Sequence, residues 1–239
     1  AQNRPFADKE LQRQVDEVYN RMTVEERTAQ LFGIRPSEVM ENGKFSVEKC
    51  RKKYPHGFGH VCQFACGLDL DGNALRDFVK QVQFYLMNET SAAIPAIFHE
   101  EAISGFAAKG ATVYPQQLGL SCTWNPELAR RKTFETAKVM RAVGATFALS
   151  PMIDLIRTAH WSRIEESYGE DSYLTAAMGA AFVEGLQGCD WRTGVAACTK
   201  HFLGYGGGSR LPWKEIYEEV LFPHEVAFRH AGCKVTMTS

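Results

Sequence analysis

Apolar residues near the start of the chain recur at helical spacing among charged residues. This pattern predicts an amphipathic helix over residues 8–21. The residues that follow, Thr23-Val-Glu-Glu26, form the sequence of a capping box, in which the first and fourth side chains satisfy backbone groups at a helix start. They predict a second helix that runs through Gln30 and Leu31.

From residue 58 onward, short apolar runs alternate with longer segments whose apolar residues recur at helical spacing. The short runs are typical of buried strands, and the longer segments are typical of helices packed on them. The predicted strands are 58–65, 94–99, 145–150, 195–199 and 234–238, and the predicted helices are 73–87, 127–143, 173–186 and 213–230. Strands that alternate with helices pair in parallel through right-handed crossovers.

This alternation predicts an α/β fold, a TIM-type (β/α)8 barrel of which the chain encodes about the first five βα units. In this interpretation residues 1–55 form an N-terminal helical segment and residues 56–239 form the incomplete barrel. A closed barrel takes roughly 250 residues, and the last predicted strand would leave an open, apolar edge. We therefore expect the front part of a longer protein. A complete open sheet of five strands is the alternative.

The balance of charges excludes several classes of partner. With 27 basic and 28 acidic residues among 239, the net charge is -1, so the chain has no basic excess for nucleic acid or anionic lipid. No apolar run approaches the roughly 20 residues of a membrane span. The chain begins Ala1-Gln2-Asn3, as after removal of a signal peptide. We hypothesise a periplasmic or secreted location, although a trimmed sequence would begin in the same way.

Seven cysteines are spread along the chain without the CxxC pairing of a zinc site. Cys62, Cys66, Cys198 and Cys233 lie in or near apolar runs, where a thiol usually behaves as a small hydrophobic group. We therefore predict no metal and no other cofactor.

Charged side chains follow three successive predicted strands, at the end of a parallel barrel where the functional residues lie. The second strand leads to His99-Glu100-Glu101, the third to Ser150-Pro-Met-Ile-Asp154, and the fourth to Lys200-His201. We expect these groups to meet at one rim. Strand alternation points Lys200 and His201 to opposite sides unless the backbone twists there. A core histidine bonded to a backbone carbonyl is the alternative interpretation of His201.

The segment before the third predicted helix adds arginines and aromatic residues. Arg157 and Arg163 flank Trp161, and arginine donates paired hydrogen bonds to hydroxyls while tryptophan packs on the C–H face of a sugar. We expect one arginine to be structural, paired with a nearby acidic residue, and the other to contact ligand. The combination predicts a sugar site. The glycine run 206–208 also leaves a phosphate site open, although no Walker-type sequence is present.

Several segments form an ordered set of motifs. They are Met22-Thr-Val-Glu-Glu-Arg27, Ile94-Pro-Ala-Ile-Phe-His-Glu-Glu-Ala-Ile-Ser-Gly105, Thr123-Trp-Asn-Pro-Glu-Leu128, the run from Trp161-Ser-Arg163 to Asp171, and Lys200-His-Phe202. In order and spacing this set resembles the N-terminal barrel of family 3 glycoside hydrolases, which include β-glucosidases, β-xylosidases and β-N-acetylhexosaminidases. The similarity covers most of residues 20–239. The chain departs from the family pattern at Ser104, Ala159-His160 and Ser172.

The resemblance implies which residues bind the substrate, an oligosaccharide or another glycoside. Glu101 stands where the family has an acidic residue that binds sugar hydroxyls. The positions of the family's other ligands for the sugar at the cleaved bond are Arg163, Lys200 and His201, with supporting roles for Trp161 and Asp154. The run Leu203–Arg210 lacks the histidine of the hexosaminidase branch, which favours the β-glucosidase or β-xylosidase branch.

The implied activity is that of a retaining exo-acting β-glycosidase on terminal β-linked sugars. Such an enzyme needs two carboxyl groups about 5 Å apart. In the family the nucleophilic Asp lies on a later barrel strand and the acid/base Glu often lies in a second domain, so the resemblance implies that this chain has neither. Glu100 and Glu101 would face apart on a strand and cannot form the pair.

We therefore expect the sugar-binding part of the enzyme, inactive by itself, with the missing C-terminal portion of the same protein as its partner. Two other interpretations stay open at this point. One is a non-catalytic sugar-binding barrel fragment, and the other is a phosphate-binding barrel enzyme that uses the glycine run.

Overall fold

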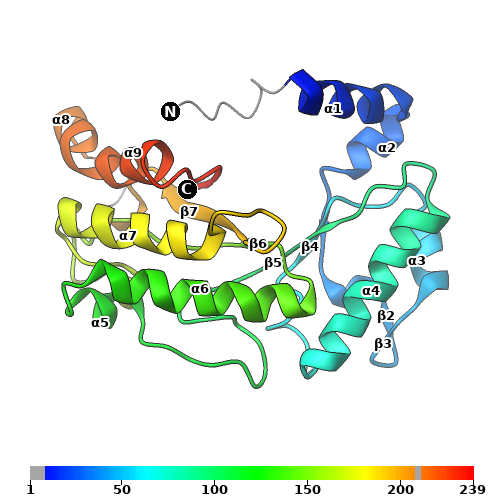
Figure 1. The fold of residues 1–239 in the computed structure, drawn as a ribbon, viewed down its shortest axis with the longest axis horizontal. Coiled ribbons are helices and arrows are strands. Elements are labelled where there is room, and N and C mark those ends of the chain that lie inside the picture. The colour runs from blue at the N-terminus through cyan, green and yellow to red at the C-terminus, as the bar shows by residue number, and fades with distance from the viewer. Residues whose placement is uncertain (1–8, 208–210) are drawn as a thin grey trace.

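Six parallel strands form one curved sheet in the part of the chain that the computed structural model describes, residues 9–207 and 211–239 (Figure 1). Each strand pairs with the next one along the sheet, in the order β1-β4-β5-β6-β7-β8. Their bounds are β1 (Gly33–Ile34), β4 (His60–Cys62), β5 (Ile97–Glu100), β6 (Phe147–Ala148), β7 (Ala196–Phe202) and β8 (Val235–Thr238). This sequential parallel order is that of a TIM-type barrel. The sheet is a half-barrel, and the predicted fold class is confirmed.

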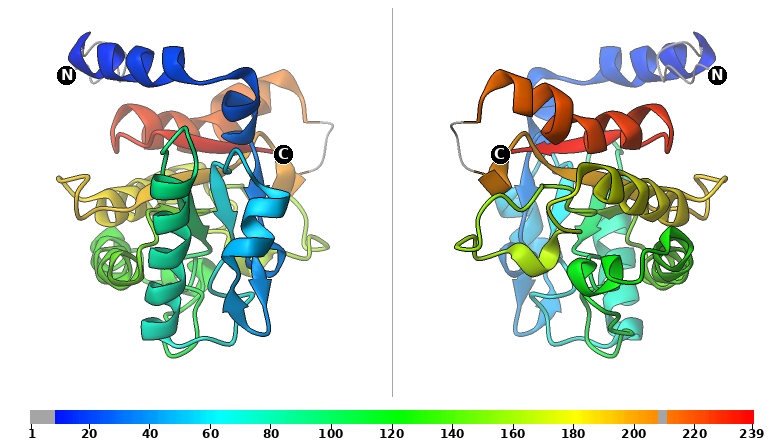
Figure 2. Two further views of the ribbon diagram at one scale, coloured as in Figure 1. Left: turned by 90° about the vertical axis from the view of Figure 1, so that its right-hand side faces the viewer. Right: turned by 90° about the vertical axis from the view of Figure 1, so that its left-hand side faces the viewer.

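The helices that follow the strands cover one face of the sheet, whereas α1 and α2 precede β1 (Figures 1 and 2). The helices of the described residues are α1 (Lys9–Arg21), α2 (Val24–Ala29), α3 (Val47–Lys53), α4 (Gly72–Glu89), α5 (Gln117–Ser121), α6 (Pro126–Val143), α7 (Ser172–Gln187), α8 (Trp213–Glu215) and α9 (Leu221–Arg229). Single turns are η2 (Pro36–Glu38), η3 (Ile164–Glu166), η4 (Tyr205–Gly207) and the π-helical η5 (Ile216–Val220). The helices α4, α6 and α7 agree with the prediction. The predicted helix 213–230 is also helical from Trp213 to Arg229, with the π-helical η5 between α8 and α9.

Capping side chains begin the three long helices that follow β4, β5 and β6. Asp71, Asn125 and Asp171 each accept a hydrogen bond from a backbone N–H in the first turn of α4, α6 and α7. Such a bond satisfies one of the N–H groups that a helix start leaves without a partner. The predicted capping box is confirmed as well, because Thr23 and Glu26 bond each other's backbone at the start of α2.

The first 55 residues contribute a strand to the main sheet in addition to helices. The strand β1 lies inside the segment predicted to be helical and pairs with β4, with Gly33 opposite His60. The same segment holds a small antiparallel hairpin, β2 (Met40–Glu41) and β3 (Lys44–Phe45). Its turn residues Asn42 and Gly43 have φ of 51° and 75°, as a tight hairpin turn requires. The half-barrel therefore has six strands where five were predicted; residues 1–8 of this segment lie outside the described residues.

The core fills the space between the sheet and its helices. Val61 of β4 and Phe98 of β5 are fully buried and belong to one cluster with Leu75 and Val82 of α4. Burial of such side chains is the main favourable contribution to folding, at about 1.5–3 kcal/mol for each large one. The core thereby holds the strand ends at fixed positions relative to one another.

All seven cysteines are free. The interpretation as small hydrophobic groups is confirmed for Cys198 and Cys233, which are buried, but it is wrong for Cys66, which is exposed. In the described ranges no helix combines the length and apolar character needed to cross a membrane. No group of three or more His, Cys, Asp or Glu side chains there is placed to hold a metal ion.

Candidate active site

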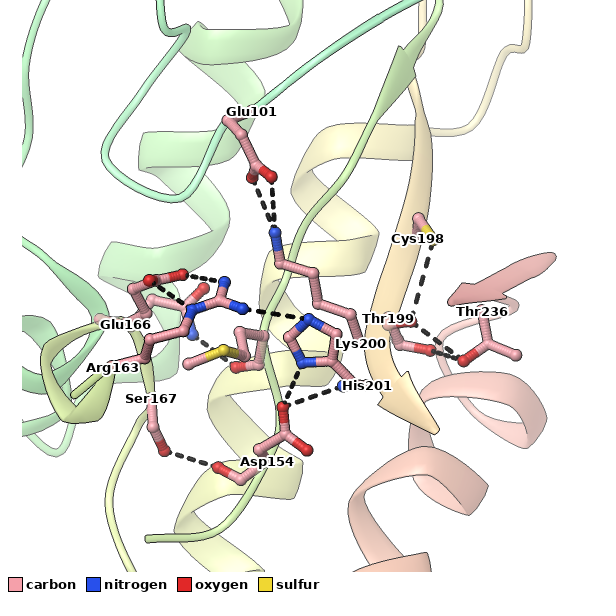
Figure 3. Close-up of polar contacts among 12 residues, drawn as sticks. Glu101, Asp154, Arg163, Glu166, Ser167, Cys198, Thr199, Lys200, His201 and Thr236 are labelled. Carbon is pink, nitrogen blue, oxygen red and sulfur yellow. Dashed lines mark hydrogen bonds and ion pairs between the residues drawn. The ribbon is translucent and has the colours of Figure 1, made fainter. Parts of the chain in front are cut away.

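An ion pair joins the segments at the carboxyl ends of β5 and β7 (Figure 3). Lys200 of β7 donates hydrogen bonds of 2.7 and 2.8 Å to the two carboxylate oxygens of Glu101, which directly follows β5. The Lys200 side chain is 2% exposed, whereas the Glu101 side chain is 30% exposed. A buried ammonium group therefore orients a carboxylate that still reaches solvent and has lone pairs left to accept hydrogen bonds.

The segment after β6 continues the parallel pairing and thereby brings Asp154 beside His201. Backbone hydrogen bonds join Lys200 N to Pro151 O and Ile153 N to Lys200 O, at 3.0 and 2.9 Å. Asp154 Oδ2 then accepts from the backbone N–H of His201 at 2.9 Å and lies 2.7 Å from its Nδ1. Because a carboxylate accepts here, we assign the ring proton to Nδ1.

The second ring nitrogen of His201 faces Arg163, with 3.2 Å between Nε2 and Nη1. Since a guanidinium group has only donors, Nε2 must accept, which gives the neutral tautomer with Nδ1 protonated. Arg163 also donates two hydrogen bonds, of 2.7 and 2.6 Å, to the two oxygens of Glu166. Burial acts to raise the pKa of Glu166, but the hydrogen bonds and charge of Arg163 outweigh it and lower that pKa. Glu166 in turn raises the pKa of Arg163, so both groups are charged at neutral pH.

Aromatic rings extend this charged cluster. The ring of Tyr205 lies 4.7 Å from that of His201 and 5.8 Å from that of Trp161, measured between centroids. The guanidinium carbon of Arg163 is 5.8 Å from the centre of the Tyr205 ring, within reach of a cation–π interaction. Tyr205 therefore connects Trp161 to the charged groups and adds apolar surface beside them.

A cavity of about 480 Å³ lies against the cluster. Glu101, Arg163, Glu165 and Glu166 line its charged side, and residues 103–108 of the loop after β5 line the other side. This volume falls in the range of roughly 300–1,000 Å³ that is typical of small-molecule sites. The cavity combines hydrogen-bonding groups of both kinds with apolar wall, as a site for a hydroxylated ring requires.

The structure brings the sequence-predicted residues together at the carboxyl ends of the strands, as Figure 3 shows for most of them. They are Glu101, Asp154, Trp161, Arg163, Lys200 and His201. Lys200 and His201 turn toward two different carboxylates. The alternative interpretation of His201 as a core histidine on a backbone carbonyl is wrong, because its Nδ1 bonds a carboxylate.

Both arginines are paired with acidic residues, Arg163 with Glu166 and Arg157 with two glutamates. Arg157 forms ion pairs with Glu215, at 3.1 Å, and with Glu219, so it joins its own loop to the segment from α8 to η5. In the glycine run, a Cβ on Gly206 would lie 2.3 Å from the carbonyl oxygen of Leu155. Close backbone packing therefore accounts for this glycine without a phosphate; the third glycine of the run lies outside the described residues.

Two buried charged residues support the site. Glu100, one of the groups expected at the rim, is instead fully buried and accepts hydrogen bonds from the backbone N–H groups of Ala65 and Cys66 in the loop after β4. The other residue was not predicted. Lys132 of α6 donates hydrogen bonds to the carbonyl oxygens of Ile103 and Pro115, the two ends of the loop that lines the cavity. Burial lowers the pKa of Lys132 to about 8. The only signal in the sequence is a lysine among the inward-facing positions of a helix.

A half-barrel of parallel strands, with paired charges at the strand ends beside a cavity, defines a protein of the β/α-barrel class. The chain belongs to glycoside hydrolase family 3: residues 23–239 match the description "Glycosyl hydrolase family 3 N terminal domain". The predicted family is therefore confirmed.

Proteins similar to this chain are described as β-xylosidases and β-glucosidases. A β-xylosidase from Formosa agariphila is 39% identical over 157 residues, which make up 58% of this chain and 22% of that protein. A periplasmic β-glucosidase from Salmonella typhimurium is 28% identical over 226 residues, 92% of this chain and 27% of that protein. The solved structure of a β-glucosidase from Erythrobacter marinus superposes with a TM-score of 0.86 at 30% identity, over 95% of this chain and 31% of the other. The chain thus spans between about a fifth and a third of the length of these proteins.

Proposed function

We propose that this chain binds the terminal sugar of a β-linked substrate in a retaining exo-acting β-glycosidase, with Glu101, Arg163, Lys200 and His201 as its ligands. The paired network around the cavity carries the proposal, because each charged group has a partner that orients it while Glu101 and Arg163 still line the cavity. A carboxylate accepts and a guanidinium donates, which together suit neighbouring sugar hydroxyls. Hydrogen bonds that tighten as the sugar ring flattens would promote the reaction as well as binding.

We propose that the carboxyl groups that break the bond come from a C-terminal portion of a longer protein. Of the carboxylates at the site, Glu101 pairs with Lys200, Glu166 with Arg163 and Asp154 with His201, so each of these three already orients a neighbouring group; Glu165 also lines the cavity. The greater length of the relatives also supports this proposal.

A periplasmic or secreted location is also part of the proposal. The periplasmic relative from Salmonella typhimurium supports it, since that protein matches 92% of this chain. Fractionation of the native host, with detection of this chain by antibody, tests the location directly; recovery only with cytoplasmic markers would contradict it.

Calorimetric titration of the chain with glucose and with xylose tests the binding proposal. We expect saturable binding of at least one sugar, and an affinity at least tenfold lower, about 1.4 kcal/mol, in Lys200→Met, because Glu101 loses its orienting partner. The control Lys138→Met removes an exposed ion pair with Glu135 on α6 and should bind as the unmodified chain does. Absence of binding of both sugars would refute the proposal.

A second assay addresses cleavage. The chain by itself should release no nitrophenol from an aryl β-glucoside, and a longer form that supplies the missing carboxylates should release it. Turnover by the 239-residue chain would show that it holds its own nucleophile. A non-catalytic sugar-binding protein is the second candidate function, and it predicts that the longer form is inactive too.

A further inference from the structure

A second cavity, of about 650 Å³, lies between the helix α6 and residues 114–123 of the chain before it. Its wall is mostly apolar and includes Tyr114, Leu120, Leu128 and Phe134. Leu128 and Phe134 are 38% and 50% exposed, so apolar surface continues from the cavity to the solvent. The residues that line it are different from those that line the first cavity, which lies against the charged cluster. The volume and the exposed apolar wall are typical of a binding site for a small molecule.

The charged side chains of the second cavity leave an excess of positive charge. Arg131, Lys132 and Glu135 line it. Glu135 already pairs with Lys138, at 2.8 Å. Arg131 is exposed and, within the part of the chain that the structure describes, has no acidic partner. The hydrogen bonds of Lys132 go to backbone carbonyl oxygens. An anionic ligand therefore fits this cavity better than a cationic one.

The ammonium group of Lys132 can donate to one further acceptor. The residue is 5% exposed, and its Nζ bonds the carbonyl oxygens of Ile103 and Pro115. An ammonium group has three N–H donors, so one donor remains for a ligand in the cavity. A hydrogen bond between charged groups is roughly twice as strong as one between neutral groups. A carboxylate accepts from both ammonium and guanidinium groups, so it suits Lys132 and Arg131 together.

The segment 113–116 separates the second cavity from the first. Its outer members, Val113 and Gln116, line the first cavity. Tyr114 and Pro115, which lie between them in the sequence, line the second cavity. The two cavities therefore share this segment as a wall, although no single side chain reaches into both among the residues that the structure describes.

Two contacts join the shared wall to the loop that lines the first cavity. The backbone N–H of Tyr114 donates to the carbonyl oxygen of Ser104 at 2.9 Å. A Cβ on Gly105 would lie 3.0 Å from the Tyr114 ring, so ring and loop are in close contact. Ser104 and Gly105 both line the first cavity. Because closely packed groups shift together, a ligand held against Tyr114 and Lys132 acts on the position of this loop.

We propose that the second cavity binds a small apolar carboxylate and that this ligand is an effector of the candidate sugar site. Its apolar part packs on Leu128 and Phe134, and its carboxylate accepts from Lys132 and Arg131. The bound carboxylate holds the Lys132 ammonium group where it bonds both ends of the loop, and so raises the affinity for the sugar. By thermodynamic linkage, the sugar raises the affinity for the carboxylate by the same factor. The effector role rests on the proposed function, whereas the binding site does not.

Calorimetric titration with phenylpropionate tests the binding site. We expect saturable binding, and binding at least about tenfold weaker for phenylpropanol, which has the same ring and no charge. Arg131→Ala should weaken the binding of phenylpropionate by about tenfold and leave that of phenylpropanol unchanged. The matched control is Arg76→Ala on α4, which also removes an exposed helical arginine, one that lies 4.0 Å from the adjacent Asp77. It should change neither affinity.

Titration of glucose in the presence of phenylpropionate tests the effector role. When phenylpropionate saturates the unmodified chain, the affinity for glucose should rise by about fivefold or more. At the same concentration Arg131→Ala should show a smaller rise, because less of the carboxylate is bound. Without phenylpropionate, Arg131→Ala should bind glucose as the unmodified chain does.

The possible failures are distinguishable. Absence of phenylpropionate binding, or equal binding of the acid and the alcohol, overturns the site. An unchanged glucose affinity in the saturated chain overturns the effector role. Loss of phenylpropionate binding in a longer form of the protein would show that its other parts cover the cavity, which also overturns the proposal. If the unmodified chain binds no sugar, the proposed function fails, while the titration with phenylpropionate still decides the second cavity.

Discussion

The hydrogen bonds from Lys132 to the loop after β5 can be tested for their contribution to the candidate site. Its ammonium group bonds the carbonyl oxygens of Ile103 and Pro115 and so closes the base of the loop that lines the first cavity. The side chain is buried, and the salt bridges of the described residues do not include it. Lys132→Met keeps the approximate length and removes the donor. We expect it to release the loop and lower the affinity for glucose about tenfold.

The effect on stability should be smaller than the loss of two hydrogen bonds suggests. The buried carbonyl of Ile103 would be left without a partner, at a cost of about 1–3 kcal/mol, whereas Pro115 is exposed, so its carbonyl can bond water instead. The pKa of Lys132, lowered from 10.5 to about 8, means that keeping its charge costs about 3 kcal/mol at neutral pH, and methionine avoids this cost. The net change in the free energy of unfolding should therefore lie between about 2 kcal/mol of gain and no change.

Urea denaturation and calorimetric titration separate these two effects. The control Met140→Ala opens a cavity in the buried face of the same helix and should cost about 2–5 kcal/mol without touching the loop. It should bind glucose normally below the unfolding transition, whereas Lys132→Met should not. Normal glucose affinity in Lys132→Met would refute the claim that Lys132 holds the loop in its binding position.

The pH dependence of stability gives an independent check on Lys132. Its pKa is lower in the folded state than in the unfolded state, so the unfolded chain holds the extra proton between about pH 8 and 10.5. The free energy of unfolding of the unmodified chain should therefore rise across this pH window when it is compared with that of Lys132→Met at each pH.

Three further predictions concern other parts of the chain. Asp154→Asn replaces a charged acceptor of His201 with a neutral one, so glucose should bind about tenfold more weakly; an unchanged affinity would contradict the orienting role of Asp154. Burial lowers the pKa of His224 from 6.5 to about 4, so the unfolded chain takes up the proton first and stability falls as the pH drops from 6.5 to 4. In His224→Phe the free energy of unfolding should fall by about 3 kcal/mol less between these two pH values, as measured by urea denaturation at each. Thr23→Ala removes the cap of α2 and should lower the free energy of unfolding by about 0.5–2 kcal/mol, with glucose affinity unchanged.

The long helices could be predicted closely from the sequence because their signals are local. Apolar periodicity and a capping residue such as Asp71 or Asp171 act within one or two turns, so they specify a helix start without reference to the rest of the fold. The hairpin β2–β3 also has a local signal in the sequence, the dipeptide Asn42-Gly43, which is typical of a two-residue hairpin turn.

The strand β1 could not be predicted in this way. It has two residues, Gly33 and Ile34, too few to show any alternation. It is a strand because its backbone groups find partners on β4. The same holds for the ion pair between Glu219 of η5 and Arg157, because it is made across the fold.

The sequence by itself determined the family, the order of the barrel elements and the identity of the residues at the strand ends, because these depend on residue types and their spacing. Only the tertiary structure decided how those residues pair. Lys200 and Glu101 are 99 positions apart, and they meet because parallel strands bring their carboxyl ends to one edge. Likewise Lys132, on the neighbouring helix α6, bonds both ends of the loop after β5, and the buried Glu100 bonds the backbone of the loop after β4. Through-space interactions of this kind leave no regular spacing in a sequence, since their geometry is set by the packing of the sheet and its helices.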